Sequence, residues 1–425
     1  MKEISFPQVV SPFEIPRIAA SFGTPVYVYS EKILDEQANK TLNFPRAHGF
    51  NVRYAMKANP NTNILRFFDQ KGIHIDASSG YEVMRAIRAG INPKNILLTS
   101  QQIPKNLSDF VSMGVEYNAC SLFQLEKYGC ENEISDVSVR INPGLGSGGT
   151  NRTNTGGPAS SFGIWHEQFG EMLDILEKYK LNVKRLHTHI GSGSDPEVWK
   201  KVALMSLENV KRLLDAGHDV YTLNLGGGYK VGRMPDEKST DLQECGNLVK
   251  QAFIDFRKKT GRALKLEIEP GTFLVANAGC LIASVIDVKR TSDYRFIVTD
   301  SGMTEITRPS LYGAQHPITI IPSTGPILKK VLEQVVTGHC CESGDILTPK
   351  SGEPEVLLPR KMLEAEIGDL VVIGGAGAYC AGMSTKNYNS YPEAAEIMIN
   401  KDGQANLIRR RQTLEQMTQN EILIL

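Results

Sequence analysis

Eight short runs of apolar and β-branched residues, separated by stretches of helical periodicity, constrain the fold of this chain most strongly. Between about residues 50 and 275 they read VRYAMKA, IHIDASS, ILLTS, VEYNACS, VSVRINP, RLHTHIG, TLNLGGG and KLEIEPG. Alternating strands and helices are typical of a parallel sheet, and eight such units can close into a barrel. We therefore predict an α/β fold with a parallel (β/α)8 barrel of the TIM type. Gly72, Gly90 and Gly129 are expected to end three of the helices, because glycine favours helix C-termini.

The chain has 425 residues, which is more than one barrel needs. After Gly271 the runs CLIASVIDVKR, RFIVTD and DLVVIGG read as strands separated by turns, and helical patterns become scarce. We expect a barrel domain over residues 26–275 and a mostly β domain over residues 276–425. The N-terminal segment, residues 1–25, is expected to join the β domain, and the strand-like PVYVYS that begins at Pro25 is expected to go with it.

Composition excludes several classes of function. Acidic and basic residues are equal at 47 each, which argues against nucleic acid or a membrane surface as the main partner. No apolar run approaches the 18 residues of a transmembrane helix, and the first 20 residues lack the apolar core of a signal peptide. The seven cysteines are an odd number and are scattered without CxxC spacing, which indicates a reduced, cytoplasmic protein with free thiols.

Polar residues and glycines gather at the ends of the predicted strands. In a (β/α)8 barrel the C-terminal ends of all strands meet at one mouth, where active sites are built. These positions are Lys57, Asp76, His189 with Ser192, Gly226, Gly227 and Gly228, and Glu269 followed by Gly271. A lysine, a histidine, a glutamate and a glycine turn at one mouth describe a binding site.

Several of these motifs allow two interpretations. The triple glycine fits a tight strand-to-helix turn or a phosphate cradle, since glycine lets backbone N–H groups approach an anion. His187 and His189 point the same way along a strand, but we find no third or fourth ligand and expect no metal site. The polar, glycine-rich segment 143–163 fits a surface loop or a loop over the barrel mouth.

The predicted β domain contains two further motifs. In CESGD, Cys341 beside Glu342 could serve as a proton donor, although adjacent cysteines such as Cys340 and Cys341 are more often small buried hydrophobic residues. In RPSLYGA, Arg308 offers a guanidinium fork that suits a carboxylate, and Tyr312 follows it; a surface arginine and a core tyrosine are the alternative.

Taken together, these motifs resemble the group III pyridoxal-phosphate decarboxylases of alanine-racemase fold, and most of all the branch that acts on meso-diaminopimelate. The resemblance rests on YAMKAN, DASSGYE, HTHIGSG, LNLGGGY, EPG, RPSLYGA, CESGD and GAYCAGMSTKNYNS, and it covers nearly the whole chain. It implies pyridoxal 5'-phosphate as cofactor, a homodimer with shared active sites, and conversion of meso-2,6-diaminopimelate to L-lysine.

The resemblance also assigns roles. Lys57 would form the Schiff base with the cofactor aldehyde, His189 would stack on its ring and Glu269 would pair with the ring nitrogen. The cofactor-binding set would be completed by Asp76, Ser192, Gly226, Gly227, Gly228, Gly271 and Tyr379, with Tyr379 approaching from the second subunit. Arg308, Tyr312 and Tyr379 would contact substrate. Cys341 and Glu342 would cross a dimer interface, as proton donor and as substrate contact.

Other substrates stay open at this point. Carboxynorspermidine, arginine or ornithine could be decarboxylated by the same chemistry, whereas an alanine racemase would set an arginine, not Glu269, against the ring nitrogen. The arginine usual in the family after EPG is replaced by Thr272, so one expected contact to phosphate or carboxylate is missing.

Overall fold

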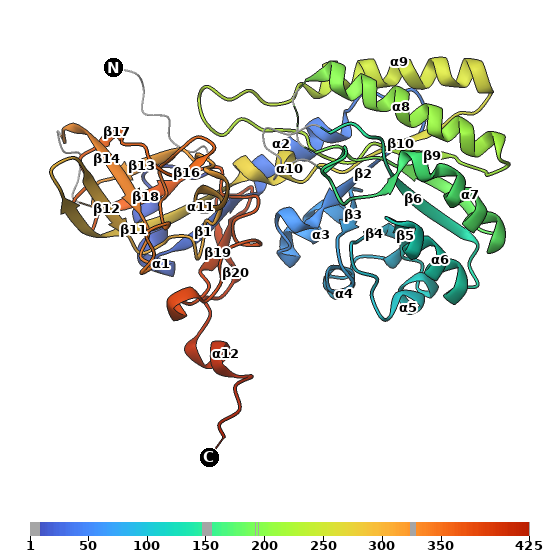
Figure 1. The fold of residues 1–425 in the computed structure, drawn as a ribbon. Helices are drawn as coiled ribbons and strands as arrows, with labels where there is room; N and C mark the ends of the chain where they lie inside the picture. Colours follow the sequence, from blue (N-terminus) through green and yellow to red (C-terminus); the bar gives the residue numbers. More distant parts are fainter. Residues whose placement is uncertain (1–8, 147–154, 192, 194, 324–328, 425) are drawn as a thin grey trace. The chain divides into compact units, whose positions relative to one another are not determined.

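The computed structural model describes residues 9–146, 155–191, 193, 195–323 and 329–424. By their internal contacts the residues form two compact units, coloured along the sequence in Figure 1. The barrel unit comprises Gln37–Val231 and Lys238–Leu274. The β unit comprises the residues up to Glu36, the short segment Gly232–Glu237 and the chain from Val275 onward.

The barrel unit is a closed ring of eight parallel strands, which confirms the predicted fold class. The strands are β2 (Phe50–Ala55), β3 (His74–Ala77), β4 (Ile96–Thr99), β5 (Glu116–Ala119), β6 (Asp136–Asn142), β8 (Asn182–His187), β9 (Thr222–Asn224) and β10 (Lys265–Ile268). They pair in the order β5–β4–β3–β2–β10–β9–β8–β6, and pairing of β5 with β6 closes the ring. A short strand, β7 (Ile164–Trp165), adds to β6 after the polar segment.

Helices follow the strands, as expected from the periodicity. They are α2 (Glu31–Leu42), which begins in the β unit, α3 (Thr62–Gln70), α4 (Gly80–Arg88), α5 (Leu107–Ser112), α6 (Leu122–Glu131), α7 (Phe169–Lys178), α8 (Pro196–Asp215), α9 (Leu242–Thr260) and α10 (Thr272–Val275). Gly72 and Gly90 lie just beyond α3 and α4 with φ of 75° and 89°, which confirms two predicted helix ends.

The third predicted helix end is wrong. Gly129 lies inside α6, which continues to Glu131. A Cβ at this position would lie 2.6 Å from Cβ of Tyr179, at the end of α7. Close packing between α6 and the end of α7, and not helix termination, therefore explains this glycine.

Charged side chains fill the barrel interior on the side away from the mouth. Glu267 on β10 is fully buried and accepts hydrogen bonds from Arg53 on β2 (3.1 Å) and Arg185 on β8 (2.7 Å). Both arginines also pair with Glu116, the first residue of β5. Since β2 and β5 are not neighbours, these contacts cross the barrel interior. Loss of one partner would leave a buried charge unpaired, which typically costs about 3–5 kcal/mol.

The next layer of side chains inside the barrel lies nearer the mouth. Side chains alternate between the two faces of a strand, so the residue two positions on points the same way, one layer higher. Two residues beyond Glu267 comes Glu269, and two residues beyond Arg185 comes His187. The barrel thus places Glu269 and His187 together, one layer nearer the mouth than Glu267 and Arg185.

The β unit is built around one long strand. Strand β11 (Gly279–Arg290) pairs with β1 (Val26–Ser30), β12 (Arg295–Thr299) and β18 (Leu370–Ile373). The remaining strands are β13 (Ile318–Ile321), β14 (Val331–Thr337), β15 (Pro349–Lys350), β16 (Glu353–Leu357), β17 (Arg360–Leu363), β19 (Ala395–Ile399) and β20 (Ala405–Arg409). The helices are α1 (Ile15–Phe22), α11 (Arg308–Tyr312) and α12 (Leu414–Thr418).

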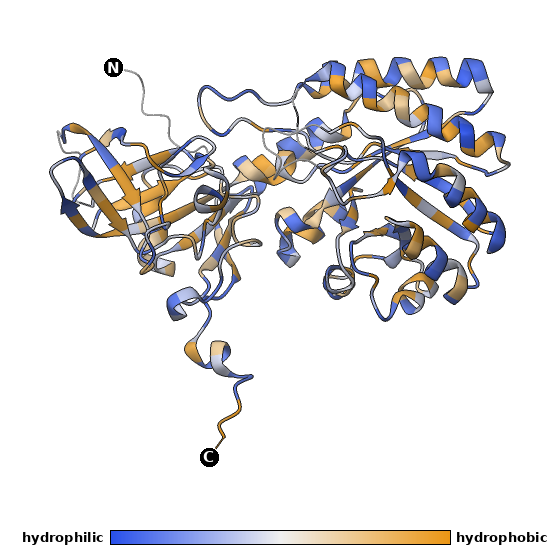
Figure 2. Cartoon of the chain, in the orientation of Figure 1, coloured by the Kyte–Doolittle hydropathy of each residue, from blue (hydrophilic) through white to orange (hydrophobic). Residues whose placement is uncertain are grey.

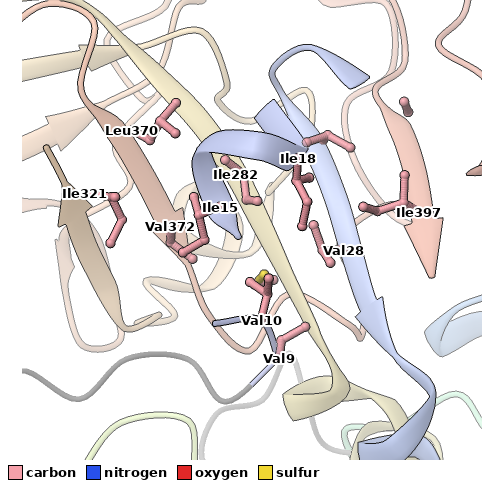
Figure 3. Close-up of a cluster of buried hydrophobic side chains, with 13 residues drawn as sticks. Val9, Val10, Ile15, Ile18, Val28, Ile282, Ile321, Leu370, Val372 and Ile397 are labelled. Carbon is pink, nitrogen blue, oxygen red and sulfur yellow. The ribbon is translucent and has the colours of Figure 1, made fainter. Parts of the chain in front are cut away.

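The core of the β unit includes the start of the chain. Ile15 and Ile18 of α1 pack on Val28, Ile282 and neighbouring strand residues, all nearly inaccessible to solvent (Figure 3). Further members of this cluster are Val9, Val10, Val26, Cys280, Ile321, Leu370, Val372, Ala395 and Ile397. The N-terminal segment is therefore held by apolar burial, which stabilises folded chains most.

Hydropathy follows this architecture. Figure 2 shows hydrophobic residues concentrated on the strands of the β unit, and hydrophilic and hydrophobic residues alternating along α8 and α9. Among the described helices, none has the length and apolar character needed to span a membrane.

Candidate active site

Lys57 lies just past a strand of the barrel. β2 ends at Ala55, and Met56–Ala58 form a single 3₁₀ turn before Asn61 caps α3 through its side chain (3.0 Å from Asn63 N). Lys57 is the exposed member of this turn, between the buried Met56 and Ala58. Its positive charge influences the pKa values of Asp76, Glu82 and His189, which places the ammonium group at the mouth.

Glu269 lies just past the end of β10 and is held by two hydrogen bonds. His187 Nε2 donates to Oε2 at 2.9 Å, and Asn224 Nδ2 donates to Oε1 at 2.7 Å. Burial alone would raise the pKa of Glu269, but these donors and the neighbouring His189 lower it to about 2. Glu269 is therefore an ionised carboxylate inside the protein.

His187 is a neutral donor. Burial lowers its pKa even though Glu269 lies beside it, so the ring is uncharged near pH 7. Its Nδ1 is buried without a hydrogen-bond partner, which leaves the proton on Nε2, the atom that faces Glu269. His187 therefore orients the carboxylate without neutralising it.

Asp76, at the mouth end of β3, has its pKa shifted in the opposite direction to that of Glu269. Burial and the negative charge of Glu269 raise its pKa well above the ordinary value, although Lys57 opposes the shift. Two nearby buried carboxyl groups rarely ionise together. The ionised Glu269 therefore makes a second negative charge at Asp76 unfavourable.

The glycine turn shows why glycine is required there. Gly226 has φ of 70°, and a Cβ on it would lie 2.6 Å from Cβ of His189 and 2.8 Å from its ring. A Cβ on Gly227 would collide with the backbone oxygen of Glu269. The backbone of this turn therefore approaches both His189 and Glu269 closely.

Asn224 joins this turn to the carboxylate. Its Oδ1 accepts a hydrogen bond from Gly226 N at 2.8 Å while its Nδ2 donates to Glu269. Gly228 follows with φ of 103°, and its carbonyl accepts from Gly193 N at 3.0 Å. One side chain thus sets the position of the glycine turn and of Glu269.

His189 presents a neutral ring over the glycine turn. Burial, together with Arg140 and Lys57 nearby, lowers its pKa well below the ordinary value. Its Nδ1 has no hydrogen-bond partner among the described residues. An uncharged, flat ring suits stacking on an aromatic ligand.

Gly271 and Ser192 complete the predicted barrel set. A Cβ on Gly271 would lie 3.2 Å from the Cβ atoms of Ala55 and Ala58, so the chain after Glu269 packs closely on the turn that carries Lys57. Ser192 lies outside the described residues.

The other predicted residues belong to the β unit. Arg308 begins α11, and its Nη1 lies 2.7 Å from His316 Nε2; Tyr312 ends the same helix. Tyr379, in the turn after β18, has φ of 57°, a left-handed conformation that is uncommon for a residue with a side chain.

Cys341 and Glu342 are exposed on a loop that a buried acid organises. Asp345 accepts hydrogen bonds from the backbone of Cys340 (2.9 Å) and Met303 (2.7 Å). Cys340 is partly buried, and burial raises the pKa of its thiol to about 12. In this loop the side chains of Cys341 and Glu342 are therefore exposed to solvent, whereas that of Cys340 is partly buried.

The barrel mouth fits pyridoxal phosphate on its own geometry. Lys57 could supply an amine, Glu269 an ionised partner for a protonated ring nitrogen, His189 a flat neutral face, and the glycine turn a close approach for an anion. Sequence reasoning missed the roles of His187 and Asn224. Their spacing, two residues before His189 and Gly226, was the available signal.

Comparisons with known proteins identify the family of this chain. The family model described as "Pyridoxal-dependent decarboxylase, pyridoxal binding domain" matches residues 31–276. The chain is 36% identical to the diaminopimelate decarboxylase of Escherichia coli K12 over 414 residues, 96% of each chain. It is 35% identical to that of Streptomyces coelicolor, over 98% of this chain and 94% of the relative.

Solved structures give the same result. A crystal structure of diaminopimelate decarboxylase matches with a TM-score of 0.89 and 35% identity, over 96% of both chains. The Helicobacter pylori diaminopimelate decarboxylase complexed with L-lysine matches with a TM-score of 0.84 and 27% identity, over 95% of this chain and 98% of that one.

The close approach at Gly226 predicts a selective loss of cofactor binding. Gly226→Ala should raise the Kd for pyridoxal phosphate about tenfold or more, because the new Cβ displaces the His189 ring. Gly72→Ala is a matched control, since Gly72 has a similar φ of 75° but nothing within 4 Å of its Cβ position. Fluorescence titration measures both; equal affinities in the two variants would contradict the predicted role of this turn.

Proposed function

Because the chain belongs to the pyridoxal-dependent decarboxylases and, within them, to the diaminopimelate decarboxylase family, we propose that it decarboxylates meso-2,6-diaminopimelate to L-lysine, the last step of lysine biosynthesis. The observation that carries this proposal is the ionised Glu269, held by His187 and Asn224 at the mouth that Lys57 also lines. A carboxylate there suits decarboxylation, whereas a racemase of this fold would place an arginine.

When bound, pyridoxal phosphate supplies an electron sink for the negative charge left at Cα by loss of carbon dioxide. Glu269 would keep the ring nitrogen protonated by direct charge pairing. His189 would hold the ring face, and Gly226, Gly227, Gly228 and Gly271 would admit the phosphate, with Ser192 and Tyr379 as further contacts. Lys57 would anchor the cofactor covalently, and Asp76, whose pKa is raised by burial and by Glu269, would line its site.

Substrate specificity is proposed to come from the β unit. Arg308, Tyr312 and Tyr379 would hold the carboxylate of the substrate head that does not react. A diamine-forming enzyme needs no such guanidinium for its product. This requirement favours diaminopimelate over ornithine or arginine as the substrate.

The active enzyme is proposed to be a homodimer with shared sites. Cys341 and Glu342 are exposed on their loop, which leaves them available to a second copy of the chain. Cys341 would return a proton to Cα, and Glu342 would contact the substrate of the partner subunit. We also propose a reducing, cytoplasmic location, in which the seven cysteines persist as free thiols.

Carbon dioxide release across a panel of amino acids tests the proposed activity. With pyridoxal phosphate, kcat/KM for meso-diaminopimelate should exceed that for ornithine, arginine and carboxynorspermidine by at least about 100-fold, because those substrates leave buried groups unpaired. Lys57→Ala should abolish turnover, and the exposed Lys105→Ala should not. Equal release from ornithine would contradict the assigned substrate.

Hybrid dimers test the shared site. Lys57→Ala and Cys341→Ala, each inactive or slow alone, should regain about a quarter of native activity when their subunits are exchanged, since half of the dimers are mixed and each has one intact site. The mixture is assayed after co-expression of the two variants with different tags. No recovery in dimers shown to be mixed would contradict a site built from two subunits.

A further inference from the structure

Three arginines gather within the β unit around one histidine and one turn. Arg308 Nη1 lies 2.7 Å from His316 Nε2, Arg360 Nη1 donates to His316 O at 2.6 Å, and Arg233 Nε donates to Gly375 O at 3.0 Å. Arg233 reaches this place from the segment Gly232–Glu237, which belongs to the β unit although it lies between barrel elements in sequence. Such a concentration of positive charge needs an anion.

His316 fixes the direction of Arg308. The ring is fully buried, and burial and the neighbouring Arg308 and Arg233 lower its pKa well below the ordinary value, so it is neutral. Its Nδ1–H donates to Gly374 O at 2.9 Å, which leaves Nε2 as an acceptor for Arg308. The guanidinium of Arg308 is therefore held through Nη1 by a neutral acceptor.

Arg233 is held by the backbone carbonyl of Gly375, the residue after Gly374. Gly374 O anchors His316 and Gly375 O anchors Arg233, so adjacent residues of one turn set both guanidinium groups. Gly375 has φ of 64°, and a Cβ on it would lie 2.8 Å from Cδ of Arg233. The turn is thus shaped to admit the arginine side chain.

The charge of Arg233 is poorly compensated by the protein. Burial, and then the nearby Arg308, lower its pKa to about 9. Its Nη2 is buried without a hydrogen-bond partner among the described residues. Glu237 is the nearest acid that acts on it, and its Oε2 already accepts from the backbone of Arg233 (2.8 Å) and Met234 (3.4 Å).

We propose that Arg233, together with Arg308, binds the carboxylate that diaminopimelate keeps and L-lysine retains, which makes Arg233 a specificity-determining residue. This inference rests on the proposed function. Two guanidinium groups match the planar, bidentate geometry of a carboxylate. Arg233 would supply the second guanidinium beside that of Arg308. Arg360 donates to the backbone carbonyl of His316, and we assign it only a role in holding His316 in place.

The test compares two ligands that differ only in this carboxylate. L-lysine and cadaverine are titrated into the pyridoxal-phosphate-loaded enzyme by calorimetry. Arg233→Gln should weaken L-lysine binding about 10- to 100-fold, the effect expected for a lost charge-assisted hydrogen bond, and change cadaverine binding less than about twofold. Arg233→Lys should recover part of the loss. Arg290→Gln, which removes an exposed arginine of the same unit, should change neither.

The outcomes separate the two proposals. An unchanged ratio of L-lysine to cadaverine affinity in Arg233→Gln, with native decarboxylation by the unaltered enzyme, would overturn the role of Arg233 alone. Equal weakening of both ligands would reduce Arg233 to a structural residue and also overturn it. Absence of carbon dioxide release from meso-diaminopimelate by the unaltered enzyme would overturn the proposed function.

Discussion

The site depends on keeping one carboxylate ionised inside the protein. Glu269 is almost fully buried, and an isolated charge there would be strongly unfavourable. Two uncharged donors, His187 and Asn224, bind its two oxygens, and its negative charge adds to the effect of burial in raising the pKa of Asp76. The charge is thus left to pair with a ligand cation and not with a protein cation.

The barrel supplies this arrangement through the alternation of its strands. Glu267 and Glu269 are two residues apart on the same face, yet their partners differ in kind. Glu267 is bound by two arginines inside the barrel, whereas Glu269 is bound by neutral groups near the mouth. Two acids on one segment of chain are therefore held in different ways, one by ion pairs and one by uncharged donors.

Much of this could be predicted from the sequence. The eight strands, their mouth and the positions of Lys57, His189 and Glu269 follow from local patterns, because strand ends in a barrel converge. The prediction that Gly129 ends a helix is wrong, because a glycine required for close packing against Tyr179 looks the same in the sequence as a glycine at a helix end. Asn224, His187 and Arg233 were not assigned because their partners lie far away in the sequence, at positions 269 and 375. For His187 and Asn224 the two-residue spacing along the chain is the only local signal, and it does not show which residue each side chain will bind.

We propose that the ionised Glu269 holds a protonated pyridine nitrogen of the cofactor. The ¹⁵N chemical shift of ring-labelled pyridoxal phosphate, bound to the native protein and to Glu269→Gln, measures this directly. We expect a protonated nitrogen in the native protein and an unprotonated one in the variant, with cofactor still bound. An unprotonated nitrogen in the native protein, or the same shift in both, would contradict it.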